Sequence, residues 1–181
     1  GSELASAVFA HRAEGVTVFF IDRPEYFDRD QLYGTPAGDY PDNAERFAFF
    51  SRAALETMRA VGFRPDVVHG HDWQAAFVFA YLKFVYAEDP FFDRTRSLFT
   101  IHNLAYQGLF EKSVLGAIGL PDSLFNMNDL EFYGKVNALK AGILYATAVT
   151  TVSPRYSREI QTPEFGCGLD GLLRHRAGVL H

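Results

Sequence analysis

An apolar run in the middle of the chain stops abruptly at a cluster of polar side chains. The segment Leu98–Ile101 is too short for a helix and predicts a buried strand of a parallel sheet. His102 and Asn103 stand at its carboxyl end, where open α/β sheets place their functional groups, and Gln107-Gly108 predicts a loop over that end. A hydrogen-bonded core histidine and a turn-forming asparagine explain the same residues, so this stretch alone leaves function open.

A second short strand, predicted at residues 65–69, also leads into polar groups. His69 and His71 share one face of an extended segment, but the spacing shows no third protein ligand, which disfavours a metal site. Asp72 is either an N-cap of the next helix or a functional carboxylate. Trp73 is placed either to stack on a sugar ring or to pack under a loop.

Predicted strands and helices alternate along the chain. Strands are expected at residues 16–21, 65–69, 98–101 and 148–152. Helices are expected at residues 74–86, 130–146 and 169–176, with a helical turn at 121–125, a helix capped by Ser153 with Pro154 at its first position, and a helix that starts at Asp42 and buries Phe47, Phe50, Ala54, Met58 and Val61. This order predicts an α/β fold with a parallel sheet and helices on both faces.

The common strand direction would bring the polar groups after residues 69, 101 and 152 to one rim of the sheet. The long segment from Asp22 to Pro41 is expected to be a functional loop, and it carries Tyr33 among its tyrosines. Asp42 and Glu45 have the spacing of a capping box. Lys140, beside the apolar stripe of its helix, is expected to extend its ammonium to solvent.

Composition narrows the possible functions. The 181 residues, 48% of them hydrophobic, suit a single domain, and the net charge of -5 disfavours nucleic acid as a partner. One cysteine excludes an intrachain disulfide and a cysteine-based zinc site, and fits a reducing cytoplasm. No apolar run is long enough to span a bilayer, so no membrane partner is expected. Both ends suggest an excerpt of a longer protein.

The absence of some motifs excludes several enzyme classes. The chain has no Gly-x-Gly-x-x-Gly after its first predicted strand, no Walker-type Gly-Lys-Ser/Thr loop and no Gly-x-Ser-x-Gly elbow. Dinucleotide-dependent hydride transfer, P-loop hydrolysis and α/β-hydrolase chemistry are therefore disfavoured.

Taken together, the motifs resemble those of bacterial glycogen synthases and plant starch synthases, retaining glycosyltransferases of family 5. The resemblance runs from about Val16 onward and is carried, in order, by Asp22-Arg23-Pro24, Asp42-Asn43-Ala44-Glu45-Arg46-Phe47, His71-Asp72-Trp73-Gln74-Ala75, His102-Asn103-Leu104-Ala105-Tyr106-Gln107-Gly108, Leu139-Lys140-Ala141-Gly142, Thr151-Val152-Ser153-Pro154, Tyr156, Glu159 and Gly168-Leu169-Asp170-Gly171-Leu172-Leu173.

The resemblance implies transfer of glucose from ADP-glucose, or less often UDP-glucose, to the non-reducing end of an α-1,4-glucan. It implies two Rossmann-like domains of the GT-B type facing a cleft, with residues 1–181 as most of the amino-terminal one. The family's Lys-x-Gly-Gly loop and its carboxyl-terminal nucleotide-binding domain are not found in the sequence. The fragment alone is therefore expected to be inactive, and removal of its neighbours is expected to favour self-association.

The same resemblance assigns roles to individual residues. His102 matches the histidine that contacts donor glucose, with its backbone carbonyl near the reacting carbon. Asp72, Trp73 and Gln74 match an acceptor-side segment with Asn103 nearby. Tyr33 matches an aromatic residue of the loop after Asp-Arg-Pro.

No cofactor and no bound metal are expected for the resembled family. The location implied is the bacterial cytoplasm, or the plastid stroma for a plant protein. A non-catalytic glucan-binding module on the same scaffold is the alternative to an enzyme.

Overall fold

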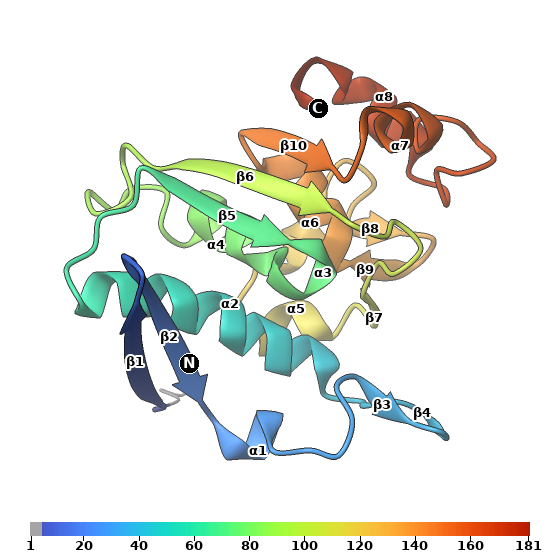
Figure 1. Ribbon diagram of the computed structural model, residues 1–181. Helices are drawn as coiled ribbons and strands as arrows, with labels where there is room; N and C mark the ends of the chain where they lie inside the picture. Colours follow the sequence, from blue (N-terminus) through green and yellow to red (C-terminus); the bar gives the residue numbers. More distant parts are fainter. Residues whose placement is uncertain (1–4) are drawn as a thin grey trace.

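Three parallel strands form the centre of the molecule, in the order β10-β6-β5 (Figure 1). The computed structural model describes residues 5–181. β5 (Val67–His71), β6 (Arg96–Ile101) and β10 (Ala148–Thr151) run in the same direction, and Leu180 bridges to the outer side of β10. The predicted α/β class with a parallel sheet is confirmed.

Side chains alternate between a packed and an open face of this sheet. Val68, Phe99 and Val149 are buried on the packed face. They lie under α4 (Phe77–Phe84) and α6 (Ala138–Tyr145), where the Phe79 ring meets that of Phe99 edge-on at 5.2 Å. On the opposite face Val67 is 54% exposed. Helices were expected on both faces, whereas in the described part of the chain these helices pack on one.

The first predicted strand has a different partner from the one expected. β2 (Val16–Asp22) pairs antiparallel with β1 (Ala7–Ala13) in a separate hairpin and lies outside the parallel sheet. Glu14 and Gly15 turn the chain with φ angles of 49° and 80°. The apolar pattern predicts a strand but carries no information on its neighbour, and a two-residue turn favours local pairing.

The long helix α2 (Asn43–Ala60) is present, but it buries a different stripe from the one predicted. Phe47 is buried, whereas Phe50 is 38% and Val61 50% exposed. The helix instead turns its smaller residues toward the rest of the core, where they permit close approach of α3 and α4. Besides Phe47, the buried members of this face include Ala44, Ala48, Ser51 and Leu55.

The helix predicted at residues 130–146 is half as long as expected. Its first part forms the hairpin β8 (Glu131–Phe132) and β9 (Lys135–Asn137), and β9 also pairs with β7 (Leu109–Phe110). Tyr133 and Gly134 form the turn with positive φ, a hairpin signal that outweighs the helical spacing of the apolar residues. The helix predicted at 74–86 is likewise divided into α3 (Asp72–Ala75) and α4.

Lys140 of α6 does not reach solvent as predicted. It is 6% exposed, and its ammonium donates hydrogen bonds to the carbonyls of Met127 and Glu131, both at 2.7 Å. Burial lowers the pKa of Lys140 below its ordinary value. The lysine thus ties the segment before β8 to the core.

The remaining elements are short, and several match the prediction. Ser153 caps α7, its hydroxyl accepting a hydrogen bond from the Tyr156 N–H at 3.1 Å, with Pro154 in the first turn. These remaining short elements are α1 (Pro24–Phe27), β3 (Gly34–Thr35), β4 (Gly38–Asp39), α5 (Val114–Ala117), the 3₁₀ helix Asp122–Leu124, α7 (Pro154–Glu159), α8 (Asp170–His175) and the 3₁₀ helix Ala177–Val179.

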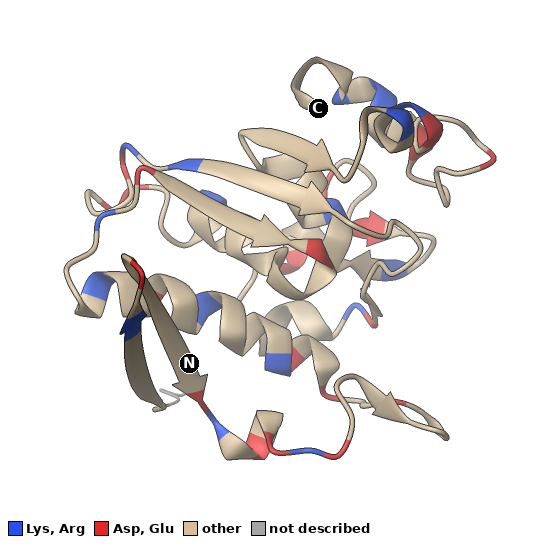
Figure 2. Ribbon diagram, viewed as in Figure 1, with Lys and Arg blue, Asp and Glu red and all other residues tan. Residues whose placement is uncertain are grey.

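Charge is sparse in the central sheet. Figure 2 shows β5 and β10 without Lys, Arg, Asp or Glu, and β6 has Arg96 alone, at its amino end. Asp72, the residue directly after β5, is acidic. Among the described residues no helix is both long and apolar enough to cross a membrane.

Candidate functional site

The carboxyl ends of β5 and β6 bring three of the predicted rim residues into contact. His71 ends β5, and its Nδ1 lies 3.0 Å from Nε2 of His102, which follows β6. Asp72 accepts a hydrogen bond from the backbone N–H of His102 at 2.7 Å. Ser153, after β10, caps its helix instead. Two of the three predicted polar groups are thus joined directly.

The Asp72 carboxylate serves the rim and not the helix that follows it. His71 occupies the N-cap position of α3, and no side chain caps that helix. Asp72 adopts a left-handed backbone with φ of 55°, uncommon for a residue other than glycine. Such a conformation persists only where surrounding contacts hold it, and here it accompanies the bond to His102.

Trp73 lies beneath the rim and not on its surface. The side chain is 7% exposed and meets the Phe47 ring edge-on at 4.8 Å between centroids. Gly108 lies so close that an added Cβ would come within 2.5 Å of a Trp73 ring carbon. Tyr33 packs at 6.1 Å on the tryptophan and keeps 43% of its surface exposed. Of these two aromatic residues, Tyr33 is therefore the one with an exposed ring.

A cavity of about 510 Å³ adjoins the rim and collects three of the predicted site residues, Tyr33, Asp72 and Gln74. Its other lining residues are Ile21, Phe27, Phe47, Phe50 and His71. Polar groups on one apolar-walled concavity are typical of a ligand site. Asn103 is not among the lining residues; its side chain accepts a bond from the Ala105 N–H at 3.0 Å in a local turn.

Comparison with known proteins identifies the family of this fold. The family model described as the starch synthase catalytic domain matches residues 3–175. The chain belongs to the starch synthase catalytic domain family. The resemblance seen in the motifs is thereby confirmed.

Individual members of the family align along almost the whole chain. The glycogen synthase of Koribacter versatilis (strain Ellin345) is 56% identical over 167 residues, which are 92% of this chain and 34% of that protein. The glycogen synthase of Geotalea uraniireducens (strain Rf4) is 52% identical over 179 residues, 98% of this chain and 37% of that protein. The chain therefore spans about a third of the length of these relatives.

A solved structure shows the same fold. The catalytic domain of starch synthase IV from Arabidopsis thaliana, bound to ADP and acarbose, superposes with a TM-score of 0.86 at 37% identity. The match covers 97% of this chain and 36% of that one. The parallel sheet and its helices are therefore part of a GT-B synthase fold.

Within this family fold, a row of three histidines lies at the rim. The rings of His69 and His71 are 4.2 Å apart, and those of His71 and His102 are 5.3 Å apart. His69 Nε2 lies 2.7 Å from the Thr100 hydroxyl oxygen, which in turn is 2.7 Å from that of Thr150. Burial first, then His71 and His102, lower the pKa of His69, so its neutral form is favoured.

Two residues that hold the Tyr33 loop were missed by the sequence analysis. Asn43 donates to the Tyr33 carbonyl at 2.8 Å, and Arg46 donates to the carbonyls of Tyr26 and Leu32 at 2.6 and 3.1 Å. Asn43 and Arg46, both 2% exposed, also bond to each other. Polar residues three apart on the buried face of a predicted helix were the signal available for them.

The predicted capping box at the start of α2 is wrong. Asp42 makes no side-chain cap, and its two oxygens accept bonds from Arg29 at 2.8 and 2.6 Å. The guanidinium holds the pKa of Asp42 below its ordinary value. A bidentate charged pair outcompetes a cap to the backbone, and it anchors the Tyr33 loop a second time.

Gln107 and Asn137 continue the polar network behind the rim. The Gln107 side chain accepts a bond from Asn137 at 2.6 Å and donates to the Cys167 carbonyl at 3.0 Å. Asn137 also caps α6 by accepting from the Lys140 N–H at 3.0 Å. The loop after His102 is therefore fastened to α6 and to the segment before α8.

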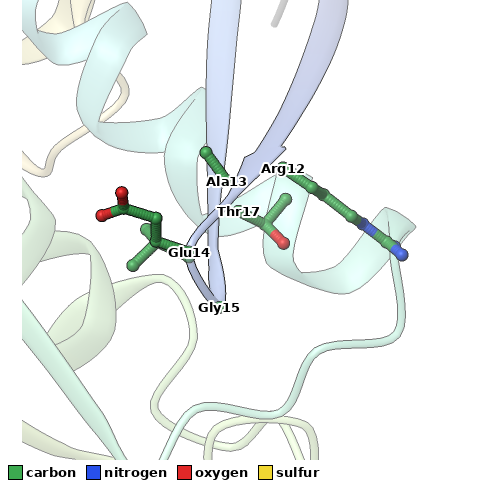
Figure 3. Close-up of a pocket in the computed structure, with 6 residues that line it drawn as sticks. Arg12, Ala13, Glu14, Gly15 and Thr17 are labelled. Atoms are coloured by element: carbon green, nitrogen blue, oxygen red, sulfur yellow. The ribbon is translucent and has the colours of Figure 1, made fainter.

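A second hollow, of about 290 Å³, lies at the turn of the β1–β2 hairpin (Figure 3). Arg12 and Glu14 point to opposite sides of that turn, so no converging charges define a site. Across residues 5–181, no three His, Cys, Asp or Glu side chains are grouped to hold a metal ion.

Proposed function

We propose that the complete protein containing this chain transfers glucose from ADP-glucose to the non-reducing end of an α-1,4-glucan with retention of configuration. The observation that carries the proposal is the alignment of 92% of the chain with a glycogen synthase at 56% identity. The related starch synthase IV domain was solved with ADP and acarbose, which supports a nucleotide-sugar donor and a glucan acceptor here.

Residues 1–181 then form part of an amino-terminal Rossmann-like domain, and a nucleotide-binding domain elsewhere in the complete protein faces it. The chain spans about a third of the length of its relatives, which supports this division into two domains. A cytoplasmic location is proposed with it, as for a bacterial enzyme.

His102 is the proposed catalytic residue. Its backbone carbonyl, at the end of β6, faces the donor sugar and stabilises positive charge that develops on the reacting carbon. The bond from its N–H to Asp72 supports this role, because it restrains the main chain at His102 on the side next to that carbonyl, which limits reorganisation during the reaction.

The cavity beside the rim is the proposed acceptor site. Tyr33 offers an exposed ring face, while Asp72 and Gln74 offer hydrogen-bonding groups to sugar hydroxyls. Trp73 contributes from beneath by supporting Tyr33. Asn103, the residue after His102, is the remaining residue proposed to bind substrate. An apolar wall with a few polar groups suits a sugar, which has both kinds of surface.

The test is incorporation of labelled glucose from ADP-glucose into glycogen by the complete protein. We expect turnover by the wild type and a loss of at least about 100-fold for Asp72→Ala, in line with the loss of one electrostatic contact at a reacting centre. Arg52→Ala, an exposed change on α2, is the matched control.

The chain alone is expected to transfer no glucose in the same assay. Turnover by the isolated chain near the rate of the complete protein would refute the domain assignment. Glucan binding by the complete protein with no transfer would favour a non-catalytic binding module instead.

A further inference from the structure

His71, the last residue of β5, lies within hydrogen-bond distance of His102, the first residue after β6. His71 and His102 belong to neighbouring parallel strands whose register pairs His71 with Thr100, two residues before His102. This offset places the two imidazoles on the same face, with Nδ1 of His71 and Nε2 of His102 at 3.0 Å. A hydrogen bond at this distance joins the ends of the two strands through their side chains.

The bond determines which nitrogen of His102 remains available. Of the two facing nitrogens, one carries a hydrogen and donates the hydrogen bond, and the other accepts that bond. In either arrangement Nε2 of His102 is occupied by His71, and Nδ1 is left for another partner. Removing His71 would free Nε2 and allow both tautomers and both ring orientations.

Neighbouring contacts restrict the His71 ring as well. His69 lies against it, with ring centroids 4.2 Å apart, and is itself bonded to Thr100. The carboxylate of the next residue, Asp72, accepts a hydrogen bond from the backbone N–H of His102. Residues 71 and 72 therefore hold His102 at its imidazole and at its peptide N–H, by two independent bonds.

We propose that His71 is a positioning residue for the glucosyl-transfer reaction, which holds the ring orientation of His102 and couples its tautomer to that of His71 through the Nδ1–Nε2 hydrogen bond. The proposal rests on the proposed function, because it assigns a task to His102. It predicts that a change at His71 affects the rate of the chemical step more than it affects glucan affinity, although His71 also lines the proposed acceptor site.

The first experiment compares His71→Ala and His71→Asn in the complete protein. The Asn amide places a polar atom near the position of Nδ1, so it preserves the bond to His102. We expect His71→Ala to lower kcat about 10- to 100-fold, by a larger factor than it raises KM for glucan, as for a small misplacement of a reacting group. His71→Asn should recover most of this loss, and His11→Asn, on exposed β1, is the control.

Unchanged kcat in His71→Ala, or a loss in KM alone, would overturn the proposal. Equal losses in His71→Ala and His71→Asn, with both folded by circular dichroism, would do the same.

The second experiment does not depend on activity. Long-range ¹H–¹⁵N spectra of the imidazoles in the complete protein should show a changed Nε2 signal of His102 in His71→Ala, because Nε2 loses its hydrogen-bond partner. A His102 spectrum that His71→Ala leaves unaltered would overturn the positioning role, even if glucosyl transfer is observed. A complete protein without glucosyl transfer, but with the expected change in the Nε2 signal, would instead count against the proposed function alone.

Discussion

At the scale of single residues, His69, His71 and His102 form a row of histidines at the rim. His69 has a lowered pKa because burial and the nearby His71 and His102 disfavour its charged form. The unfolded chain therefore binds a proton at His69 more readily than the folded one. This contribution to stability is complete above the unfolded pKa, about 6.5, and is lost as the pH falls toward the folded value.

We therefore expect the free energy of unfolding to decrease as the pH falls below about 6.5, and to decrease less in His69→Gln. Urea titrations at several pH values measure this. His11→Gln, which removes an exposed histidine from β1, should behave like the wild type. An identical pH dependence in His69→Gln and the wild type would contradict the assignment.

Arg46 is the residue on which the Tyr33 loop depends most. Arg46→Met should lower the free energy of unfolding by about 3 kcal/mol or more, because three acceptors lose their donor and each unsatisfied group costs about 1–3 kcal/mol. Urea denaturation measures the change. Arg52→Met, on the exposed side of the same helix, should stay within about 0.5 kcal/mol of the wild type. Equal effects of the two variants would show that the buried contacts contribute nothing.

At the scale of elements, the caps of α7 and α5 offer a matched pair. Ser153 accepts a bond from the Tyr156 N–H, whereas Ser113, at the N-cap of α5, makes no such bond. Ser153→Ala should therefore cost about 1 kcal/mol of unfolding free energy and Ser113→Ala close to none. Thermal unfolding of the two variants tests this, and a loss in Ser113→Ala as large as in Ser153→Ala would argue against the cap.

Two glycines with positive φ offer a second matched pair of variants: Gly108, in the loop over Trp73, and Gly134, at the β8–β9 turn. Gly134, at the β8–β9 turn, has positive φ and open space around its Cα, so Gly134→Ala should cost only the strain of a left-handed residue, about 1–2 kcal/mol. Gly108 has positive φ as well, but a Cβ added to it would lie 2.5 Å from a carbon of the Trp73 ring. Gly108→Ala should therefore be more destabilising and should shift the fluorescence of Trp73, the only tryptophan. Unaltered emission would mean that the loop lifts away without disturbing the ring.

The position of the polar side chains at the strand ends was predictable, because parallel strands have their carboxyl ends at the same edge of the sheet. The contact of Asp72 with His102 follows from that rule, but its atoms do not, since they depend on the left-handed turn at residue 72. The hairpins β1–β2, β3–β4 and β8–β9 were all missed as hairpins. Apolar spacing at Phe132 and Val136 fits a helix as well as a strand, and only the Tyr133-Gly134 turn distinguishes them.

The burial of α2 could not be predicted for a related reason. Apolar residues occur around most of its circumference, so periodicity does not select one face. The face that is buried is selected by the shapes of α3 and α4, which are distant in sequence. Arg46 shows the same limit, because its three acceptors lie on a loop whose path the sequence pattern does not define.

At the scale of the whole molecule, the β1–β2 hairpin stands apart from the parallel sheet (Figure 1). Phe9 and Phe20 are directly opposed across its strands and are 59% and 57% exposed. Val16 on the same hairpin is 62% exposed. A two-stranded hairpin with apolar side chains in water is of marginal stability and promotes association.

We expect the isolated chain to self-associate through this hairpin as its concentration rises. Sedimentation velocity over a range of concentrations measures the association, and Phe9→Ser combined with Phe20→Ser should weaken it by removing the opposed aromatic pair. Tyr133→Ser is the control, because Tyr133 is 82% exposed but lies on the β8–β9 turn. Monomers at every concentration would contradict self-association, and an equal effect of Tyr133→Ser would show that general surface hydrophobicity, and not the hairpin, holds the copies together.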